Sequence, residues 1–409
     1  MAVSVATLSN AMKDYYSPLR VAQQFLEAKA FSVIPKNTKY EGDKFVHPVQ
    51  SALGAGYSAD ASVAFSNSSP AAPRFSRWEI DPVHAYNGRV ITGDVIDRVR
   101  SMAGSFVGSA VALSQDDTMK EFVSATGAYI WGDGSGSLGT IASVSGNNLT
   151  LTNPSDALKF RIGQVVQSFV SGNPAVESGT ATLATVDPDT GILTTTVATW
   201  ATAIASIAAG QGLVQQGTYL AVFGGIPAWI PTYDARAAGI LATTFNNVAR
   251  SANPVILAGS VLAGNGAPKV STLERLAVKI QQVGGTAPDY AFVSFDDYAD
   301  FLEYLGTRAQ IVTDSAYKMP QVSFPAMQLS TAIGTVKIVP DQFVPPDNAW
   351  VINSKDWEFF STGAYPYTRL HDGLVLRMLE QSDNYMYGIK GLGNLYCRRP
   401  FAQGTCRFS

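Results

Sequence analysis

The sequence is poor in the residues on which most metal sites and many enzymes depend. Its 409 residues include two cysteines, Cys397 and Cys406, and three histidines, His47, His84 and His371. Two cysteines cannot supply a metal quartet, and the histidines share no HxH or HxxxH spacing, so no metal site is predicted. The cysteines lie close enough in the chain for one disulfide, but we predict two free thiols.

Charge is scarce as well. Charged residues make up 15% of the chain and hydrophobic residues 46%, and the formal net charge is −3 at pH 7. A dedicated nucleic-acid-binding protein normally carries a basic excess, so this class is disfavoured, although local phosphate contacts remain allowed. Few surface charges on a long chain predict that much of the surface meets other protein. A β-rich soluble monomer is the alternative explanation.

Long apolar runs are missing. The stretch 201–209 is far shorter than the ~20 residues of a membrane span. The first residues, MAVSVATLSNAMKDYY, show no basic start followed by a long apolar core. The sequence therefore predicts synthesis inside the cell, without a signal peptide, and no membrane partner.

Motifs for catalysis or cofactor binding are not found. The glycine-rich run GDGSGSLG at 132–139 leads into a strand-like segment, whereas a phosphate loop opens a helix, so we predict a helix end there. DPDTG at 187–191 lacks the downstream carboxylate of a calcium loop and predicts a β-turn. No GxSxG or Cys-His signature is present. We predict that the protein is not an enzyme, takes no cofactor, and has no catalytic, cofactor-binding or metal-binding residues.

The longest helical pattern lies within 92–136. Its apolar residues recur at spacings of three and four, which keeps one helix face apolar. They are Val95, Ile96, Val99, Met102, Phe106, Val107, Met119, Phe122 and Val123. Ser114, followed by Asp116 and Asp117, predicts a break or a second start. A helix over 101–131 would be a rod of roughly 45 Å at ~1.5 Å per residue.

Two extended features precede this helix. Residues 1–39 are predicted to form an amphipathic arm, interrupted at Ser17 and Pro18. Within 40–91, the segments 44–49 and 74–80 alternate like the limbs of a long hairpin, joined by a small, polar and flexible stretch. Because a two-stranded ribbon is barely stable alone in water, we expect it to lie across a partner.

The second half of the chain changes character twice. Residues 137–218 are rich in Thr and Val and predict a β-sandwich or barrel-like module whose two ends lie near one another. From 219 onward the pattern is mixed. A helix is expected to start at Ser271 as cap, with Glu274 in the capping box and Gly284 past its end. A strand over 289–295, a helix over 296–306 and later strands predict a sheet flanked by helices.

Four stretches of the sequence carry a family resemblance. RVITGDVIDRV and AYIWGDGSG are similar to the start and the end of a spine helix. DYAFVSFDDYADFLEYLG resembles a strand–helix unit, and GTVKIVPDQFVPPDNAWVINSKDWEFFSTG resembles a set of return strands. In this order they resemble the major capsid proteins of tailed bacteriophages, whose fold is shared with encapsulins and herpesvirus capsids.

The resemblance implies an α+β fold with six parts. These are an N-terminal arm (1–39), an extended hairpin loop (40–91), the spine helix and peripheral domain (92–136), an inserted β-rich domain (137–218), the axial domain (219–345), and return strands with a C-terminal tail (346–409). The insertion of roughly 80 residues departs from simpler family members.

The implied function is mechanical. The chain would self-assemble, as hexamers and pentamers, into the icosahedral head that encloses the double-stranded DNA of a phage. Expected partners are the portal and scaffolding proteins of the same phage, a decoration or cement protein, and packaged DNA, contacted on the inner face without sequence specificity. The virion is the expected location, after synthesis in the cytoplasm of the host bacterium. An encapsulin-type nanocompartment shell and a β-rich fibre or adhesin protein are the alternatives.

Six residues are predicted to contact neighbouring subunits, five because they are basic and one because tryptophan is enriched in interfaces. They are Lys13, Arg20, Lys44, Arg74, Arg77 and Trp78. For the basic residues, a solvated face is the alternative. Lys44 is also a possible cross-linking lysine, but nothing in the sequence marks its partners, so no cross-link is predicted.

Overall fold

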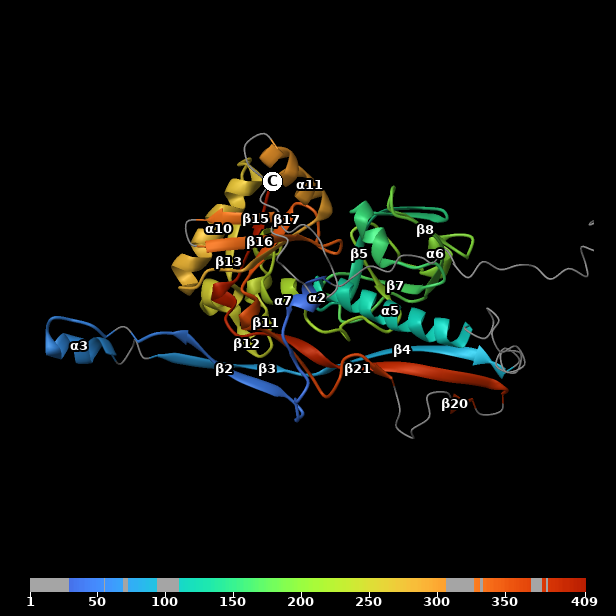
Figure 1. Ribbon diagram of the computed structural model, residues 1–409, viewed down its shortest axis with the longest axis horizontal. Helices are drawn as coiled ribbons and strands as arrows, with labels where there is room; N and C mark the ends of the chain where they lie inside the picture. The colour runs from blue at the N-terminus through green and yellow to red at the C-terminus, as the bar shows by residue number, and fades with distance from the viewer. Residues whose placement is uncertain are drawn as a thin grey trace, which may run out of the picture. The chain divides into compact units, whose positions relative to one another are not determined.

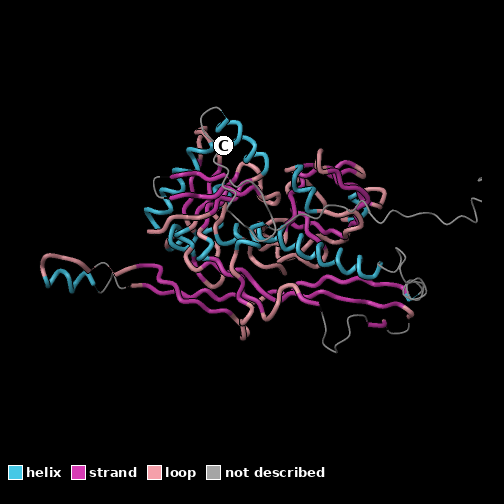
Figure 2. Tube along the Cα trace, viewed as in Figure 1, coloured by secondary structure: helices cyan, strands magenta, loops and turns pink. Residues whose placement is uncertain are grey.

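The computed structural model describes residues 29–54, 56–68, 73–93, 110–306, 327–331, 334–368, 377–379 and 382–409 (Figures 1 and 2). The described chain forms two compact units. The smaller contains residues 86–93, 110–122, 368, 377–379 and 382–389, and the larger contains the rest. Most of the predicted arm, the first half of the predicted long helix and His371 lie outside the described residues.

The smaller unit combines strands with the first part of a helix. Strand β4 (Val83–Thr92) and strand β20 (Arg377–Met378) both pair with β21 (Asn384–Cys397). Glu121 on helix α5 (Ala110–Ile130) accepts hydrogen bonds from Asn87 (3.2 Å) and Arg89 (3.1 Å). The hydroxyls of Thr118 and Tyr387 also hydrogen-bond to each other.

Helix α5 corrects one prediction and confirms another. It continues past Ser114 without a break, and Asp116 pairs with Lys120 one turn later (2.5 Å), so the predicted second start is wrong. The helix ends at Ile130, directly before the glycine run, as predicted. Gly136 has a φ of +85°, and a Cβ there would lie 2.5 Å from the Thr218 carbonyl oxygen, so only glycine fits this turn.

The predicted hairpin is present. Strands β2 (Phe45–Ala52) and β3 (Arg74–Ile80) are antiparallel, with Phe45 opposite Ile80 and Gln50 opposite Phe75. We call these strands and the residues between them the ribbon. Figure 1 shows helix α3 (Ala61–Ser68) at its end, where the sequence suggested only a flexible stretch. Ala and Ser dominate this helix and leave no periodic apolar face, so pattern reading could not detect it.

Residues 137–215 form a closed barrel with the strand order β10-β5-β6-β9-β8-β7. The strands are β5 (Ser137–Ser145), β6 (Asn148–Leu151), β7 (Val165–Phe169), β8 (Ala181–Asp187), β9 (Ile192–Thr195) and β10 (Gly212–Gln215). Val214 of the last strand lies opposite Ser137 of the first, so the two ends are adjacent, as predicted. The turn at 187–191 is also confirmed: the Asp187 carboxylate accepts from the Asp189 amide (3.0 Å) and the Thr190 hydroxyl (2.6 Å).

A second sheet of six strands has the order β13-β22-β17-β14-β16-β15. Its strands are β13 (Ser260–Ala263), β14 (Tyr290–Val293), β15 (Met327–Thr331), β16 (Gly334–Pro340), β17 (Asn348–Ile352) and β22 (Gly404–Arg407). Its core includes Leu276, Ile280, Phe301 and Ile338. Strands β17 and β22 follow residue 345 but belong to the same sheet as β13 to β16. The domain boundary expected after residue 345 therefore falls inside one sheet.

The helices at this sheet are α10 (Lys269–Gly284) and α11 (Phe295–Gly306). Helix α10 begins two residues before Ser271, with Pro268 at the cap position, so Ser271 is not the cap. Its C-cap is Gly285, at a φ of +67°, and Gly284 is the last helical residue. The local sequence predicted the helix but not its ends.

A further sheet runs β1-β18-β21-β19. It contains β1 (Lys36–Asn37), β18 (Trp357–Ser361) and β19 (Tyr367–Thr368), and helix α2 (Lys29–Val33) precedes it in the chain. Short elements complete the described fold. They are α6 (Trp200–Ala203), α7 (Ile226–Trp229), α8 (Tyr233–Ala237), α9 (Pro254–Ala258), β11 (Thr244–Phe245), β12 (Val248–Ala249), η2 (Pro154–Lys159), η3 (Ile240–Ala242), η4 (Arg250–Ala252), η5 (Ser354–Asp356) and η6 (Pro400–Ala402).

Candidate assembly surfaces

The two faces of the ribbon differ. Side chains alternate between faces along a strand, so Phe45, Trp78 and Ile80 fall on one face and Val46 and Phe75 on the other. Trp78 and Ile80 are buried, whereas Val46 is 51% exposed and Phe75 is 69% exposed. The ribbon therefore shows apolar side chains to solvent on a face that this chain does not cover.

The buried face anchors the root of the ribbon. The Phe45 ring stacks on Phe360, with centroids 4.8 Å apart, and the Trp78 ring meets Trp229 edge-on at 5.1 Å. Trp78 has no exposed surface in this chain. Its side chain is thus a core residue of its own subunit, which corrects its prediction as an intersubunit contact. The partners that bury it lie about 150 residues further along the chain, beyond the reach of a local pattern.

The predicted basic contact residues do not gather into one site. Lys44 pairs with Asp81 (3.5 Å) and Arg77 with Glu79 (2.6 Å), both near the ribbon root. Arg74 is exposed at the start of β3. Exposed ion pairs of this kind contribute little to stability. Lys13 and Arg20 lie outside the described residues, so the assignment of these five residues to subunit contacts stays a prediction.

The end of the ribbon, residues 53–68, is its most exposed apolar part. We call this segment the ribbon tip. Leu53 is 80% exposed, Tyr57 98%, Val63 45% and Phe65 79%. None of the eight residues of α3 is buried. Because so short a helix is marginal in water without tertiary packing, the tip has the character of a surface that a partner covers.

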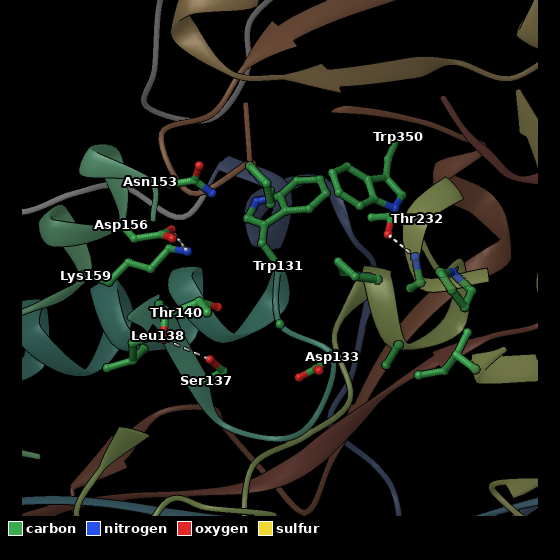
Figure 3. A pocket seen from close by; sticks show the side chains of 18 of the residues that line it. Trp131, Asp133, Ser137, Leu138, Thr140, Asn153, Asp156, Lys159, Thr232 and Trp350 are labelled. Carbon is green, nitrogen blue, oxygen red and sulfur yellow. Dashed lines mark hydrogen bonds and ion pairs between the residues drawn. The ribbon is translucent and has the colours of Figure 1, made fainter. Parts of the chain in front are cut away.

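A cavity of about 370 Å³ lies between the barrel and the segment 227–250, both in the larger unit (Figure 3). In Figure 3, Asn153, Asp156 and Lys159 reach it from the barrel, while Thr232 and Trp350 lie on the opposite side. Its further lining includes Pro227, Pro231, Ile240, Thr243, Phe245 and Arg250. The wall combines apolar side chains with polar and charged ones, so it can receive a group that has both characters.

Four charged residues line this cavity, Asp133, Asp156, Lys159 and Arg250, and Arg250 is only 2% exposed. Its Nη1 donates to the Ala228 carbonyl oxygen (2.7 Å), and its guanidinium lies 4.4 Å from the Phe245 ring centroid. Its Nε has no hydrogen-bond acceptor among the described residues. Burial lowers the pKa of Arg250 to about 10, so the side chain remains a cation at neutral pH. Across the cavity, Lys159 and Asp156 form an ion pair, with Nζ and Oδ1 2.6 Å apart. Sequence reading missed this site because its lining comes from distant segments.

The cysteines and acidic residues show no sign of metal chemistry in the described part of the chain. Cys397 and Cys406 are free and buried, as predicted, and burial raises the pKa of both thiols. Among the described residues, no three His, Cys, Asp or Glu side chains are grouped to hold a metal ion. The described helices also include none that is long and apolar enough to cross a membrane.

Comparison with known proteins gives one family match and several structural matches. Residues 202–370, which are 169 of the 409, match the family described as SU10 major capsid protein. No curated protein sequence is detectably similar.

Among solved structures, the capsid asymmetric unit of cyanophage A-1(L) superposes with a TM-score of 0.60 at 11% identity, and the alignment covers 99% of each chain. At this identity the match shows a shared fold. A chain of Mycobacterium phage Adephagia gives 0.47 at 10% identity, over 100% of this chain and 98% of that one. The SrpI encapsulin of Synechococcus elongatus gives 0.45 at 10% identity, over 100% and 96%.

Proposed function

We propose that the chain is a major capsid protein of the phage type, with the structural task of building a shell, and that it closes this shell through its ribbon. In this proposal the ribbon of each subunit lies across a neighbouring subunit. The observation that carries the proposal is the contrast between the anchored root, where Trp78 is fully buried, and the tip, where Phe65 is 79% exposed. Burying such side chains between symmetry-related copies stabilises an assembly without catalysis, because symmetry multiplies each weak contact.

We also propose the partners that the family resemblance implies. The subunits would associate as hexamers and pentamers, with portal and scaffolding proteins of the same phage and a decoration protein as further partners. The packaged DNA would meet the inner face without sequence-specific contacts, which suits a chain with a net charge of −3 and no basic excess. The chain would be synthesised in the cytoplasm of the host bacterium and would reside in the virion.

Electron microscopy of the purified chain tests shell formation. We expect closed icosahedral particles, and particles from infected cells that protect double-stranded DNA from nuclease. Empty shells loaded only with protein cargo would favour a nanocompartment instead. A chain that stays monomeric at high concentration, under conditions that preserve its fold, would contradict the proposal.

A shortened ribbon tests the role of the tip. Ala52 lies opposite Arg74, so an Asn-Gly turn in place of residues 53–73 can close the hairpin. We expect this variant to fold with the thermal stability of the wild type but to form no closed shells. Ile162→Ser, at a 71% exposed barrel position, is the control that should assemble normally. Normal shells from the shortened chain would refute the role of the ribbon.

A further inference from the structure

The cavity beside the barrel holds a cation that its own chain leaves uncompensated. Arg250 is buried, and its partners among the described residues are one carbonyl oxygen and one aromatic ring, with no carboxylate. A buried charge without a counterion is costly, and its Nε is a buried donor without an acceptor. A carboxylate entering the cavity would supply what is missing. The cavity thus favours an anionic group carried on an apolar support.

The ribbon tip carries such a group. Asp60 is the one charged residue in 53–68, and it is exposed. Its Oδ1 accepts from the Ser62 amide (2.8 Å), the Ser62 hydroxyl (2.7 Å) and the Val63 amide (3.3 Å). Its Oδ2 has no hydrogen-bond donor in the described structure, so one carboxylate oxygen caps α3 while the other is available. These hydrogen bonds lower the pKa of Asp60 and keep it ionised.

The apolar surroundings of the two sites match as well. Tyr57, Val63 and Phe65 surround Asp60 on the tip and are exposed. Pro227, Ile240 and Phe245 form part of the cavity wall, and they lie close to Arg250 in the sequence. A volume of about 370 Å³ lies within the range of ~300–1,000 Å³ that is typical of binding cavities. A projecting group and a receiving cavity on different parts of one chain are what a head-to-tail contact needs, and such contacts form a ring when the rotation between copies closes.

We propose that the cavity at Arg250 receives the ribbon tip of a second copy of this chain, with Asp60 of that copy against the Arg250 guanidinium. The proposal rests on the proposed shell function and adds to it the receiving site and the charge pair. Each subunit donates one tip and offers one cavity, so every contact around a ring is equivalent. Docking also gives α3 the tertiary packing that it lacks in the single chain.

Cross-linking between two variants tests the contact. Ala59→Cys, at an exposed position next to Asp60 that leaves the carboxylate in place, is combined in one assembly mixture with Thr243→Cys, which places a thiol at an exposed position of the cavity lining. Cys397 and Cys406 are buried, so a short bismaleimide reagent should react with the introduced thiols. We expect a covalent dimer of the two variants in assembled particles and none in unassembled chains. Ala59→Cys mixed with Ile162→Cys, on the exposed barrel surface, is the control that should give no dimer.

A conservative variant tests the charge pair. Asp60→Asn preserves the cap of α3, because Asn caps helices as well as Asp, but removes the charge. We expect the concentration needed for assembly to rise about tenfold, the effect of losing one favourable charge pair. Asp43→Asn, at an exposed acid near the ribbon root, makes the same charge change and should leave it unaltered.

The outcomes separate this inference from the shell function. If the wild type forms no particles, the shell function fails and the receiving site fails with it. If particles form but the Ala59–Thr243 pair gives no dimer, or if Asp60→Asn behaves like Asp43→Asn, only the receiving site is overturned. Restoration of Asp60→Asn assembly by added acetate would support the charge pair, because the free anion would take the place of the lost carboxylate.

Discussion

The barrel and the ribbon are both antiparallel β structures, yet they differ in whether their strand edges are paired and their apolar side chains buried. The six barrel strands close on themselves, so each has two paired neighbours, while β2 and β3 pair only with each other. Inside the barrel, Leu149, Leu193 and Leu213 have no exposed surface. On the ribbon, Phe75 and Phe65 are more than two-thirds exposed. The barrel is complete as a single chain, whereas the ribbon is complete only with a partner.

The difference shows which regions are stabilised by contacts within the chain. In the barrel, burial and edge pairing occur within about 80 neighbouring residues, so the module holds together by itself. The strands of the ribbon are held on one face, by aromatic contacts such as Phe45 with Phe360 and by the Asn253 amide, which donates to the Ser51 carbonyl oxygen (3.1 Å). Substitutions should therefore change folding in the barrel and at the root, and assembly at the tip.

Trp200→Ala should have the largest effect. The Trp200 ring is fully buried in the barrel, and its Nε1 donates to the Asn147 carbonyl oxygen (3.0 Å). Removing it leaves a cavity and an unpaired acceptor, at an expected cost of about 3–5 kcal/mol of unfolding free energy. Urea unfolding measures this change. Far-UV circular dichroism is the probe, because it does not rely on the fluorescence of the removed tryptophan. Ile162→Ala, at an exposed position, is the control, and equal stability of the two variants would contradict the barrel core.

Phe45→Ala should have a smaller effect, located at the ribbon root. The half-buried Phe45 ring contacts Phe360 at 4.8 Å and Tyr396 at 4.9 Å. Loss of two aromatic contacts at about 0.5–1.5 kcal/mol each should loosen the root and speed proteolytic cleavage of the ribbon. Limited proteolysis with mass spectrometry measures the cleavage rate. Phe75→Ala on the exposed face should leave that rate unchanged, and a rate increase in both variants would mean that the root does not anchor the ribbon.

Mild acid should weaken the ribbon root but not the barrel. Burial, followed by the charge of Arg398, lowers the pKa of His47, while Glu358 opposes the shift. The folded state then binds fewer protons than the unfolded state, so the contribution of neutral His47 is complete above a pH of about 6.5 and is lost as the pH falls below it. His47→Gln should flatten the pH dependence of unfolding in this window. An unchanged pH profile for His47→Gln would count against this assignment.

Phe65→Ser should have the smallest effect on the free chain. The side chain is 79% exposed, so the unfolding free energy should change by less than about 0.5 kcal/mol. The concentration needed for assembly should nevertheless rise, because the lost apolar surface is buried only between subunits. Thermal unfolding and light scattering of the same samples measure the two quantities. A large loss of stability without any loss of assembly would reverse the comparison between ribbon and barrel.

Several features of the fold follow from short stretches of sequence. The limbs of the ribbon alternate with period two, the turn at Asp187 is set by its own carboxylate, and the glycines after Ile130 end helix α5. In each case the deciding interactions lie within a few residues, where side-chain alternation, turn chemistry and glycine conformations act. The order of these local features was also sufficient for the family resemblance.

Other features were decided by contacts between residues far apart in the chain. Trp78 is a core residue because Trp229 packs against it, and β22 joins the second sheet because it pairs with β13 and β17. Arg250 lines a cavity whose opposite wall comes from the barrel, nearly 100 residues earlier. No local pattern records which distant segment will cover a side chain. Local sequence patterns therefore predicted most of the long elements and their order, although not helix α3. Contacts between distant segments decided which side chains are buried, which are left for a partner, and where the charge of Arg250 lacks a counterion.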